Sequence, residues 1–302
     1  MKRSLFSSLV LIVAGGLFAE PCAQTASTAV QGAAMKPAAV DLMTLHQDAR
    51  CKQVLATALV NDVPLLVLLD TGATHTVLHT ERAKRLSGEG VKWLDTSKIQ
   101  FNGNAQQRPE LLLTSIKVGP GEFDPRPLLV MDLSGIRSMM DEKVEGIIGM
   151  DLLRYLPFTF DFHAKQFQWG YAALPELAAL KGECDPNLRL KMAVASGGKT
   201  FSLLLDTGST VTRVRECDWA PGRGEVIAAQ ISDINAAGKR DLREGKAGVL
   251  TLASGVETRA FQPLLCGEEE LTMLGLDALE GLILFHLPGA NAPGGDFFIG
   301  KP

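Results

Sequence analysis

The tripeptide Asp-Thr-Gly occurs twice in this chain, at residues 70–72 and 206–208. Each copy directly follows an apolar run, Leu65–Leu69 in the first case and Phe201–Leu205 in the second. Such a pattern predicts a buried strand that delivers an acidic side chain into a glycine-containing turn. Two copies predict that two carboxyl groups, those of Asp70 and Asp206, are brought face to face.

The surroundings of the tripeptide repeat as well. Turn signals at residues 61–62 and 197–198 each begin nine positions before the Asp, and all these features are related by one shift of 136 positions. Downstream, each half has a short apolar strand that ends in glycine, at Gly149 and Gly275, followed by an Asp suited to capping a short helix, Asp151 or Asp277. The spacing predicts an internal duplication into two related lobes and excludes a solenoid.

The amino terminus has the pattern of an export signal. Basic residues at 2–3 precede an apolar run from Leu5 to Phe18, and small residues follow. We expect a signal peptide over residues 1–24, a flexible lead-in over 25–48, and a periplasmic or secreted protein. Lipid attachment at Cys22 is an alternative that the preceding Glu20-Pro21 disfavours. No other apolar run is long enough to predict a membrane span after signal removal.

The rest of the chain, about 250 residues, suffices for two lobes with buried cores. We expect an N-terminal lobe over residues 49–172 and a C-terminal lobe over 183–302. The formal net charge of −4 comes without a basic patch, so no nucleic-acid partner is predicted. No Cys-x-x-Cys pair and no His at ligand spacing indicates a metal, and no cofactor is predicted.

Segments with β character dominate both halves, and helices are few. The predicted fold is all-β. The expected helices are Thr80–Leu86, Met150–Tyr155 and a linker helix over Leu174–Leu180. The predicted strands are 53–60, 65–69, 98–101, 111–118, 127–131, 158–162 and 167–170 in the first half, and 188–195, 201–205, 225–231, 247–253, 259–265 and 282–286 in the second.

Four cysteines remain after signal removal: Cys51, Cys184, Cys217 and Cys266. In an exported chain an even count permits disulfides, with three possible pairings. We favour Cys51–Cys184 as a bridge between the lobes, with Cys217–Cys266 inside the second lobe. The alternative is four free, buried thiols.

Paired Asp-Thr-Gly turns, each followed by an apolar-apolar-Gly strand and a short helix, resemble the pepsin/retropepsin superfamily of aspartic proteases. The resemblance covers most of the chain from about Cys51 onward. It implies two acid-protease-like β-barrel lobes in one chain, related by a pseudo-twofold axis, with a peptide-binding groove between them. The resemblance implies these roles: Asp70 and Asp206 as the catalytic dyad, Thr71 and Thr207 exchanging hydrogen bonds across the interface, and Gly72 and Gly208 allowing close approach of the two turns.

The two turns differ in their next residue, which is Ala73 in the first and Ser209 in the second. A serine at this position can donate a hydrogen bond to its carboxylate and favour ionisation, whereas alanine cannot. We therefore expect Asp206 to ionise more easily than Asp70. We also expect a pH optimum less acidic than that of pepsin.

Pepsins cover the substrate with a hairpin that carries a tyrosine. Both tyrosines of this chain, Tyr155 and Tyr171, lie beyond the first apolar-apolar-Gly strand, so neither fits this role. The flap candidates are residues 102–108, which contain Gly103, and 232–242, which contain Gly238. Both are polar and predicted as mobile loops. Two ordinary hairpin loops are the alternative.

The predicted function is that of an exported aspartic endopeptidase acting on peptides or proteins. One ionised carboxylate would take a proton from a water held between the pair, while the protonated partner binds the scissile carbonyl. The alternative is a protein that binds peptides in the same groove without cleaving them. We expect a monomer, and pairing of lobes between two chains is the remaining arrangement.

Overall fold

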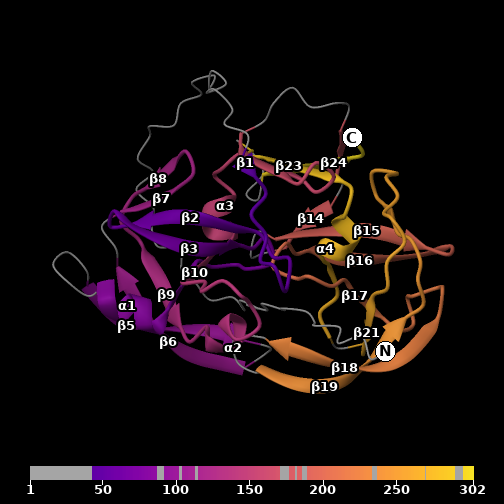
Figure 1. The fold of residues 1–302 in the computed structure, drawn as a ribbon, viewed down its shortest axis with the longest axis horizontal. Helices are drawn as coiled ribbons and strands as arrows, with labels where there is room; N and C mark the ends of the chain where they lie inside the picture. Colours follow the sequence, from indigo (N-terminus) through magenta and orange to yellow (C-terminus); the bar gives the residue numbers. More distant parts are fainter. Residues whose placement is uncertain are drawn as a thin grey trace.

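The computed structural model describes residues 43–86, 92–101, 104–112, 115–170, 177–180, 182–185, 189–232, 237–268, 270–289 and 295–302. Strands dominate these residues and form two nine-stranded sheets and one six-stranded sheet. The helices of the described ranges are α1 (Thr80–Leu86), α2 (Ser134–Arg137), α3 (Met150–Leu153) and α4 (Leu276–Leu279). The prediction of an all-β fold with few short helices is confirmed (Figure 1).

The first nine-stranded sheet comes entirely from the first half of the chain. Its strand order is β5-β6-β9-β4-β10-β3-β2-β7-β8. The strands are β2 (Leu55–Val60), β3 (Val63–Leu69), β4 (Val77–His79), β5 (Lys92–Phe101), β6 (Asn104–Leu112), β7 (Ile116–Val118), β8 (Gly121–Phe123), β9 (Pro127–Met131) and β10 (Gly146–Ile148).

The second nine-stranded sheet comes from the second half. Its main path is β14-β15-β16-β22-β17-β21-β19-β18, and β20 pairs with β15 beside it. The strands are β14 (Gly182–Cys184), β15 (Leu190–Ser196), β16 (Lys199–Leu205), β17 (Arg213–Arg215), β18 (Arg223–Ser232), β19 (Ala237–Gly245), β20 (Thr251–Leu252), β21 (Leu264–Cys266) and β22 (Met273–Leu274).

Both sheets use the same strand pairing around the Asp-Thr-Gly turns. β3 lies parallel to β10, with Leu69 opposite Ile148, and β16 lies parallel to β22, with Leu205 opposite Leu274. β10 is in turn antiparallel to β4, as β22 is to β17. β3 and β16 end in buried leucines because each is flanked by strands on both sides. The duplication predicted from the sequence is therefore present in the topology.

The six-stranded sheet contains strands from both halves. Its order is β1-β12-β11-β23-β24-β13, and the central pair runs from Phe158 opposite His286 to Asp161 opposite Ile283. In Figure 1 its strands β1, β23 and β24 lie at the top, opposite the hairpins β5–β6 and β18–β19 at the bottom. The strands are β1 (Met43–Thr44), β11 (Phe158–Asp161), β12 (Gln166–Trp169), β13 (Ala178–Ala179), β23 (Ile283–Leu287) and β24 (Asp296–Gly300).

Two helix predictions need correction. Residues 178–179 of the expected linker helix form β13, which pairs with β24, and residues 174–176 lie outside the described part of the chain. Asp151 and Asp277 do not cap their helices. The N-cap residues of α3 and α4 are Gly149 and Gly275, without a side-chain cap.

A continuous apolar core crosses between the two halves. It includes Val67 and Phe160 from the first half and Leu203 and Leu284 from the second. Burial of such residues is the main favourable term in folding, so the halves are stabilised jointly. Among the described helices, none combines the length and apolar character needed to cross a membrane.

Candidate active site

The two Asp-Thr-Gly turns begin where β3 and β16 end. The N–H of Asp70 donates to Ile148 O at 3.0 Å, and the N–H of Asp206 donates to Leu274 O at 3.1 Å. Each aspartate is therefore fixed by the parallel strand beside it. Both are fully buried, at 0 % exposure.

The carboxyl groups meet across the seam between the two halves. A methyl group at Gly72 would lie 2.4 Å from Cγ of Asp206, and one at Gly208 would lie 2.3 Å from Cγ of Asp70. No real Cβ is found so close to another atom, so only glycine fits at either position. The carboxyl groups are also close enough for the charge of Asp70 to raise the pKa of Asp206. Two such groups cannot both ionise easily. They therefore share one proton.

Thr71 and Thr207 lock the two turns together. Thr71 N–H donates to Oγ1 of Thr207 and Thr207 N–H donates to Oγ1 of Thr71, each at 3.1 Å. The hydroxyls continue the network, since Thr71 Oγ1 donates to Leu205 O at 3.1 Å and Thr207 Oγ1 to Leu69 O at 2.9 Å. The structure thus has the hydrogen-bond exchange that the resemblance implied.

The two carboxyl groups are not equivalent. Oδ1 of Asp70 accepts N–H groups from Gly72 at 2.8 Å and Ala73 at 3.0 Å, whereas Oδ1 of Asp206 accepts one, from Gly208 at 2.9 Å. Burial raises the pKa of Asp70 to about 6. Burial, together with the neighbouring charge of Asp70, raises the pKa of Asp206 well above its usual range. Asp70 is therefore the carboxyl group that ionises first.

This order reverses the one expected from the sequence. The hydroxyl of Ser209 donates to Val211 O at 2.8 Å and not to the carboxylate of Asp206. The expectation was wrong because Ser209 finds a backbone acceptor within its own turn. Backbone N–H groups add to the asymmetry of the pair, because Oδ1 of Asp70 accepts two of them and Oδ1 of Asp206 accepts one.

The Oδ2 atoms are the free acceptors of the site. Within the described ranges, neither Asp70 Oδ2 nor Asp206 Oδ2 accepts a hydrogen bond from an N–H or O–H group. Both are buried, and an unpartnered buried carboxylate oxygen is costly. These two atoms are thus the natural contacts for a water molecule or, where one of them carries the shared proton, for a substrate carbonyl.

Asp151 and Asp277 accept hydrogen bonds from threonines that follow the two dyad turns. Thr76 Oγ1 donates to Asp151 Oδ1 at 2.8 Å, and Thr212 Oγ1 donates to Asp277 Oδ1 at 2.6 Å. The same hydroxyls accept the N–H groups of Gly149 and Gly275. Burial raises the pKa of Asp151, and it raises that of Asp277 to about 7. These aspartates tie α3 and α4 to the turns that carry the dyad.

Two further side chains reach the dyad turns, and the sequence motifs predicted neither. Gln53 Nε2 donates to the carbonyl of Gly208, and Arg189 Nη1 donates to the carbonyl of Gly72 at 3.5 Å. Each precedes the Asp of its own half by 17 positions. The shift of 136 positions could therefore have found them, but a Gln aligned with an Arg carries no recognisable motif.

The flap candidates fall in two long hairpins. Gly103 lies outside the described residues, and Gly238 lies in β19 opposite Ile231. Residues 104–108 and 237–242, which the sequence predicted as loops, belong to strands. The hairpins have matching strands, of 10 and 9 residues in each, and both lie along the lower edge of Figure 1.

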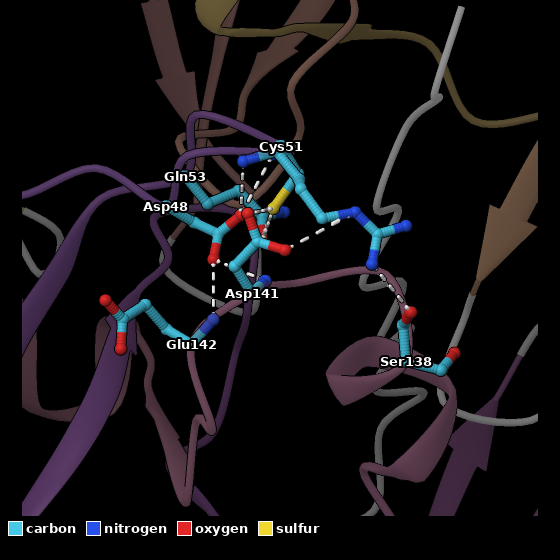
Figure 2. A network of polar contacts seen from close by, with 7 residues as sticks. Asp48, Cys51, Gln53, Ser138, Asp141 and Glu142 are labelled. Carbon is cyan, nitrogen blue, oxygen red and sulfur yellow. Dashed lines mark hydrogen bonds and ion pairs between the residues drawn. The ribbon is translucent and has the colours of Figure 1, made fainter. Parts of the chain in front are cut away.

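The predicted disulfides are absent from the structure. Cys51, Cys184, Cys217 and Cys266 do not pair with one another. The thiol of Cys51 instead donates to Asp48 Oδ1 at 3.2 Å, and it lies 3.6 Å from Gln53 Oε1 (Figure 2). Burial and the adjacent Asp48 raise the pKa of this thiol to about 12. In the described residues, no three His, Cys, Asp or Glu side chains form a group that could hold a metal ion.

Comparison with known proteins places these turns in context. Residues 56–152 match the family model described as aspartyl protease. Among solved structures, the chain is similar to the EIAV protease complexed with the inhibitor HBY-793, at 30% sequence identity. That match covers 34% of this chain and 88% of the EIAV chain, with a TM-score of 0.26. No curated protein sequence matches the chain.

Proposed function

We propose that this chain is an exported endopeptidase that hydrolyses peptide bonds with the Asp70–Asp206 pair, because residues 56–152 match the aspartyl protease family model and both halves carry an Asp-Thr-Gly turn. The close approach of the two dyad turns, which places each carboxyl group against the glycine of the other turn, carries this proposal. Gly72 and Gly208 permit it, and the exchange between Thr71 and Thr207 maintains it.

The inequivalence of the pair assigns the two chemical roles. Asp70 ionises first and acts as the base that takes a proton from the attacking water. Asp206 keeps its proton and donates a hydrogen bond to the scissile carbonyl, which stabilises the developing negative charge. Water adds to the carbonyl carbon, and the resulting tetrahedral species breaks its C–N bond as the amine takes the proton that Asp70 removed from the water. No covalent bond to the enzyme is formed.

The surrounding chain would bind the substrate. We assign an N-terminal lobe to residues 49–172 and a C-terminal lobe to 183–302, with the peptide lying between them over the dyad. Hairpins β5–β6 and β18–β19 would close over it as a pair of lids, one from each lobe. A single chain supplies both aspartates, which supports a monomer as the active form.

Export by a signal peptide over residues 1–24 completes the proposal. Expression of the full chain with its amino terminus intact should yield a shortened protein outside the cytoplasm. The measurement is the amino-terminal sequence of that protein. An uncleaved chain recovered from the cytoplasm would contradict export while leaving the protease proposal standing.

The decisive test is digestion of an unfolded protein by the mature chain between about pH 3 and 8. We expect Asp70→Asn and Asp206→Asn each to lower the rate by about 10³-fold or more, because each removes one half of an acid–base pair. Asp124→Asn is the matched control, since Asp124 is exposed in the loop between β8 and β9.

The outcomes separate the two candidate functions. Cutting that survives either dyad substitution would overturn the assignment of the site. A parent chain that cuts nothing in this pH range, yet binds unfolded peptides, would favour the peptide-binding protein that keeps the groove without the chemistry.

A further inference from the structure

Gln53 and Arg189 make matching contacts on opposite sides of the seam. Both are buried, at 0 % and 6 % exposure. Each reaches from its own half to the carbonyl of the glycine in the opposite Asp-Thr-Gly turn, Gln53 to Gly208 and Arg189 to Gly72. The two side chains therefore occupy equivalent positions in the two halves, but they differ in charge. One side chain is a neutral amide and the other is a cation.

An aspartate lies a few residues before each of these side chains. In the first half, Asp48 Oδ1 accepts the thiol of Cys51, which lies against the amide oxygen of Gln53 (Figure 2). Asp48 Oδ2 also accepts the N–H groups of Asp141 at 2.9 Å and Glu142 at 3.0 Å. The single hydrogen of the thiol goes to Asp48, so Cys51 packs against the amide of Gln53 without donating to it.

In the second half, the anchor is a direct ion pair. Asp185 Oδ2 accepts Nε of Arg189 at 2.8 Å and Nη2 at 2.6 Å, leaving Nη1 directed at Gly72. Charge-assisted contacts of this kind are short and directional. Both partners are largely buried, with side-chain exposures of 7 % for Arg189 and 18 % for Asp185. The guanidinium is therefore fixed next to the dyad.

The position of Arg189 has an electrostatic consequence. Burial raises the pKa of both dyad carboxyl groups, and the charge of Arg189 acts against this by stabilising the ionised forms. Asp185 partly neutralises Arg189. Asp185 and Arg189 line a pocket. The other charged side chains that line it are Lys191, Arg215, Glu268 and Glu270. Of these, Arg215 pairs with Asp218 and Glu270 with Arg213, and Asp185 is the carboxylate that contacts the guanidinium of Arg189.

We propose that Gln53 and Arg189 are paired positioning residues that hold the two Asp-Thr-Gly turns in register, and that the charge of Arg189 sets the pH range in which the dyad carries a single proton. This inference rests on the proposed protease function. In this proposal, the pH range is set by the second half of the chain, through Arg189, although the site is nearly symmetric.

Two substitutions with opposite expected effects test it. Arg189→Gln places a neutral amide on both sides of the seam, so both limbs of the pH profile of kcat/KM should move to higher pH by about half a unit or more. Asp185→Asn leaves the guanidinium without its counter-charge, so both limbs should move to lower pH. A purely structural disturbance would not move them in opposite directions.

Charge-neutral controls separate positioning from electrostatics. Gln53→Met removes the contact with Gly208 without changing charge, and should lower kcat/KM about tenfold while the limbs stay in place. Arg189→Lys should keep the limbs near those of the parent chain. Arg85→Gln removes an exposed positive charge from α1 and should change neither quantity.

Removing one partner of a buried ion pair can prevent folding. If Arg189→Gln does not fold, the double variant Arg189→Gln/Asp185→Asn leaves no buried charge unpaired. The double variant should also shift both limbs of the pH profile to higher pH. Of the two charges that it removes, the positive one is in contact with the dyad turn, at Gly72.

NMR titration of the carboxyl carbons of Asp70 and Asp206, assigned with the two Asp→Asn variants, measures the same shifts without any substrate. Opposite shifts in an inactive chain would support this inference while the protease function fails. An active chain whose limbs and carboxyl titrations ignore both Arg189→Gln and Asp185→Asn would overturn the inference and leave the protease function standing.

Discussion

Thr71 and Thr207 each donate a backbone N–H to the hydroxyl of the other, both at 3.1 Å, across the seam between the two halves. Each hydroxyl then donates to a carbonyl at the end of the opposite strand, β16 or β3. Each hydroxyl therefore accepts one hydrogen bond and donates one. Both Thr71 and Thr207 are almost completely buried. The network fixes the backbone of both dyad turns.

We expect Thr71→Val and Thr207→Val each to destabilise the fold by about 2–3 kcal/mol, because each leaves a buried N–H and a buried C=O unpaired. The double variant should cost less than the two single changes together, since they break one shared network. Denaturant unfolding measures all three. Thr71→Ser is the control and should restore most of the loss, and strict additivity would mean that the two threonines act independently.

Glycine is required at two positions for a steric reason. A Cβ at Gly72 or Gly208 would enter the carboxyl group of the opposite aspartate. We expect Gly72→Ala and Gly208→Ala each to reduce kcat by about 10²-fold or more, because displacement of a reacting group by about 1 Å has that effect. Gly170→Ala is not a suitable control, because its φ of +86° disfavours any side chain. Gly267→Ala is suitable, since it has open space around it and should leave kcat unchanged.

The hydroxyl of Ser209 faces away from the dyad carboxylate, toward Val211 O. We therefore expect Ser209→Ala to change kcat/KM by less than about threefold and to leave the pH profile in place, since a single neutral hydrogen bond is lost outside the reacting groups. Steady-state kinetics across the pH range measure this. A clear upward shift of the acidic limb would mean that the hydroxyl contacts Asp206 during the reaction.

The buried carboxyl group of Asp277 should make stability depend on pH. Burial raises its pKa to about 7, so between about pH 4 and 7 the folded chain keeps a proton that the unfolded chain has released. Its contribution to stability is present at low pH and is lost as the pH rises through 7, by up to about 4 kcal/mol.

Urea unfolding at about pH 4.5 and 7.5 tests the Asp277 prediction. Asp277→Asn should reduce the difference between the two pH values, because the amide cannot ionise. The buried carboxyl groups of Asp70, Asp151 and Asp206 still contribute the remainder. Asp124→Asn should retain the slope of the parent chain. An equal slope in all three proteins would assign the pH dependence to other groups.

The strands that carry the dyad were predictable because their sequences are unambiguous. β3 and β16 are short apolar runs bounded by turn signals, and α1 has the predicted bounds of Thr80–Leu86. The duplicated spacing is also sufficient to predict that Asp70 and Asp206 meet. Local pattern and tertiary contact agree in these segments.

The long hairpins were mostly missed. β6 has a polar sequence that includes Pro109 and lacks alternating apolar residues, and β19 has charged residues at five of its nine positions. Their strand character comes from pairing with β5 and β18, and with β9 and β21, which no local pattern reveals. β13 is two residues long and depends on β24 in the same way.

Side-chain partners within the site were the least predictable. Ser209 had a carboxylate and a backbone carbonyl within its own turn to choose from, and only the folded geometry decides between them. Cys51 was assigned to a disulfide because its place ahead of the first turn matches that of Cys184. In the structure it is enclosed by Asp48 and Gln53 instead.

The pairing of β11 with β23 joins the two halves of the polypeptide in one sheet. A chain cut between residues 170 and 177 would give fragments that each expose a bare strand edge bearing Phe158 and Phe160 on one side, or Leu284 and Phe285 on the other. Such fragments would reassociate or aggregate before they could work alone. A single polypeptide therefore supplies the two halves in a fixed one-to-one ratio and keeps both strand edges covered.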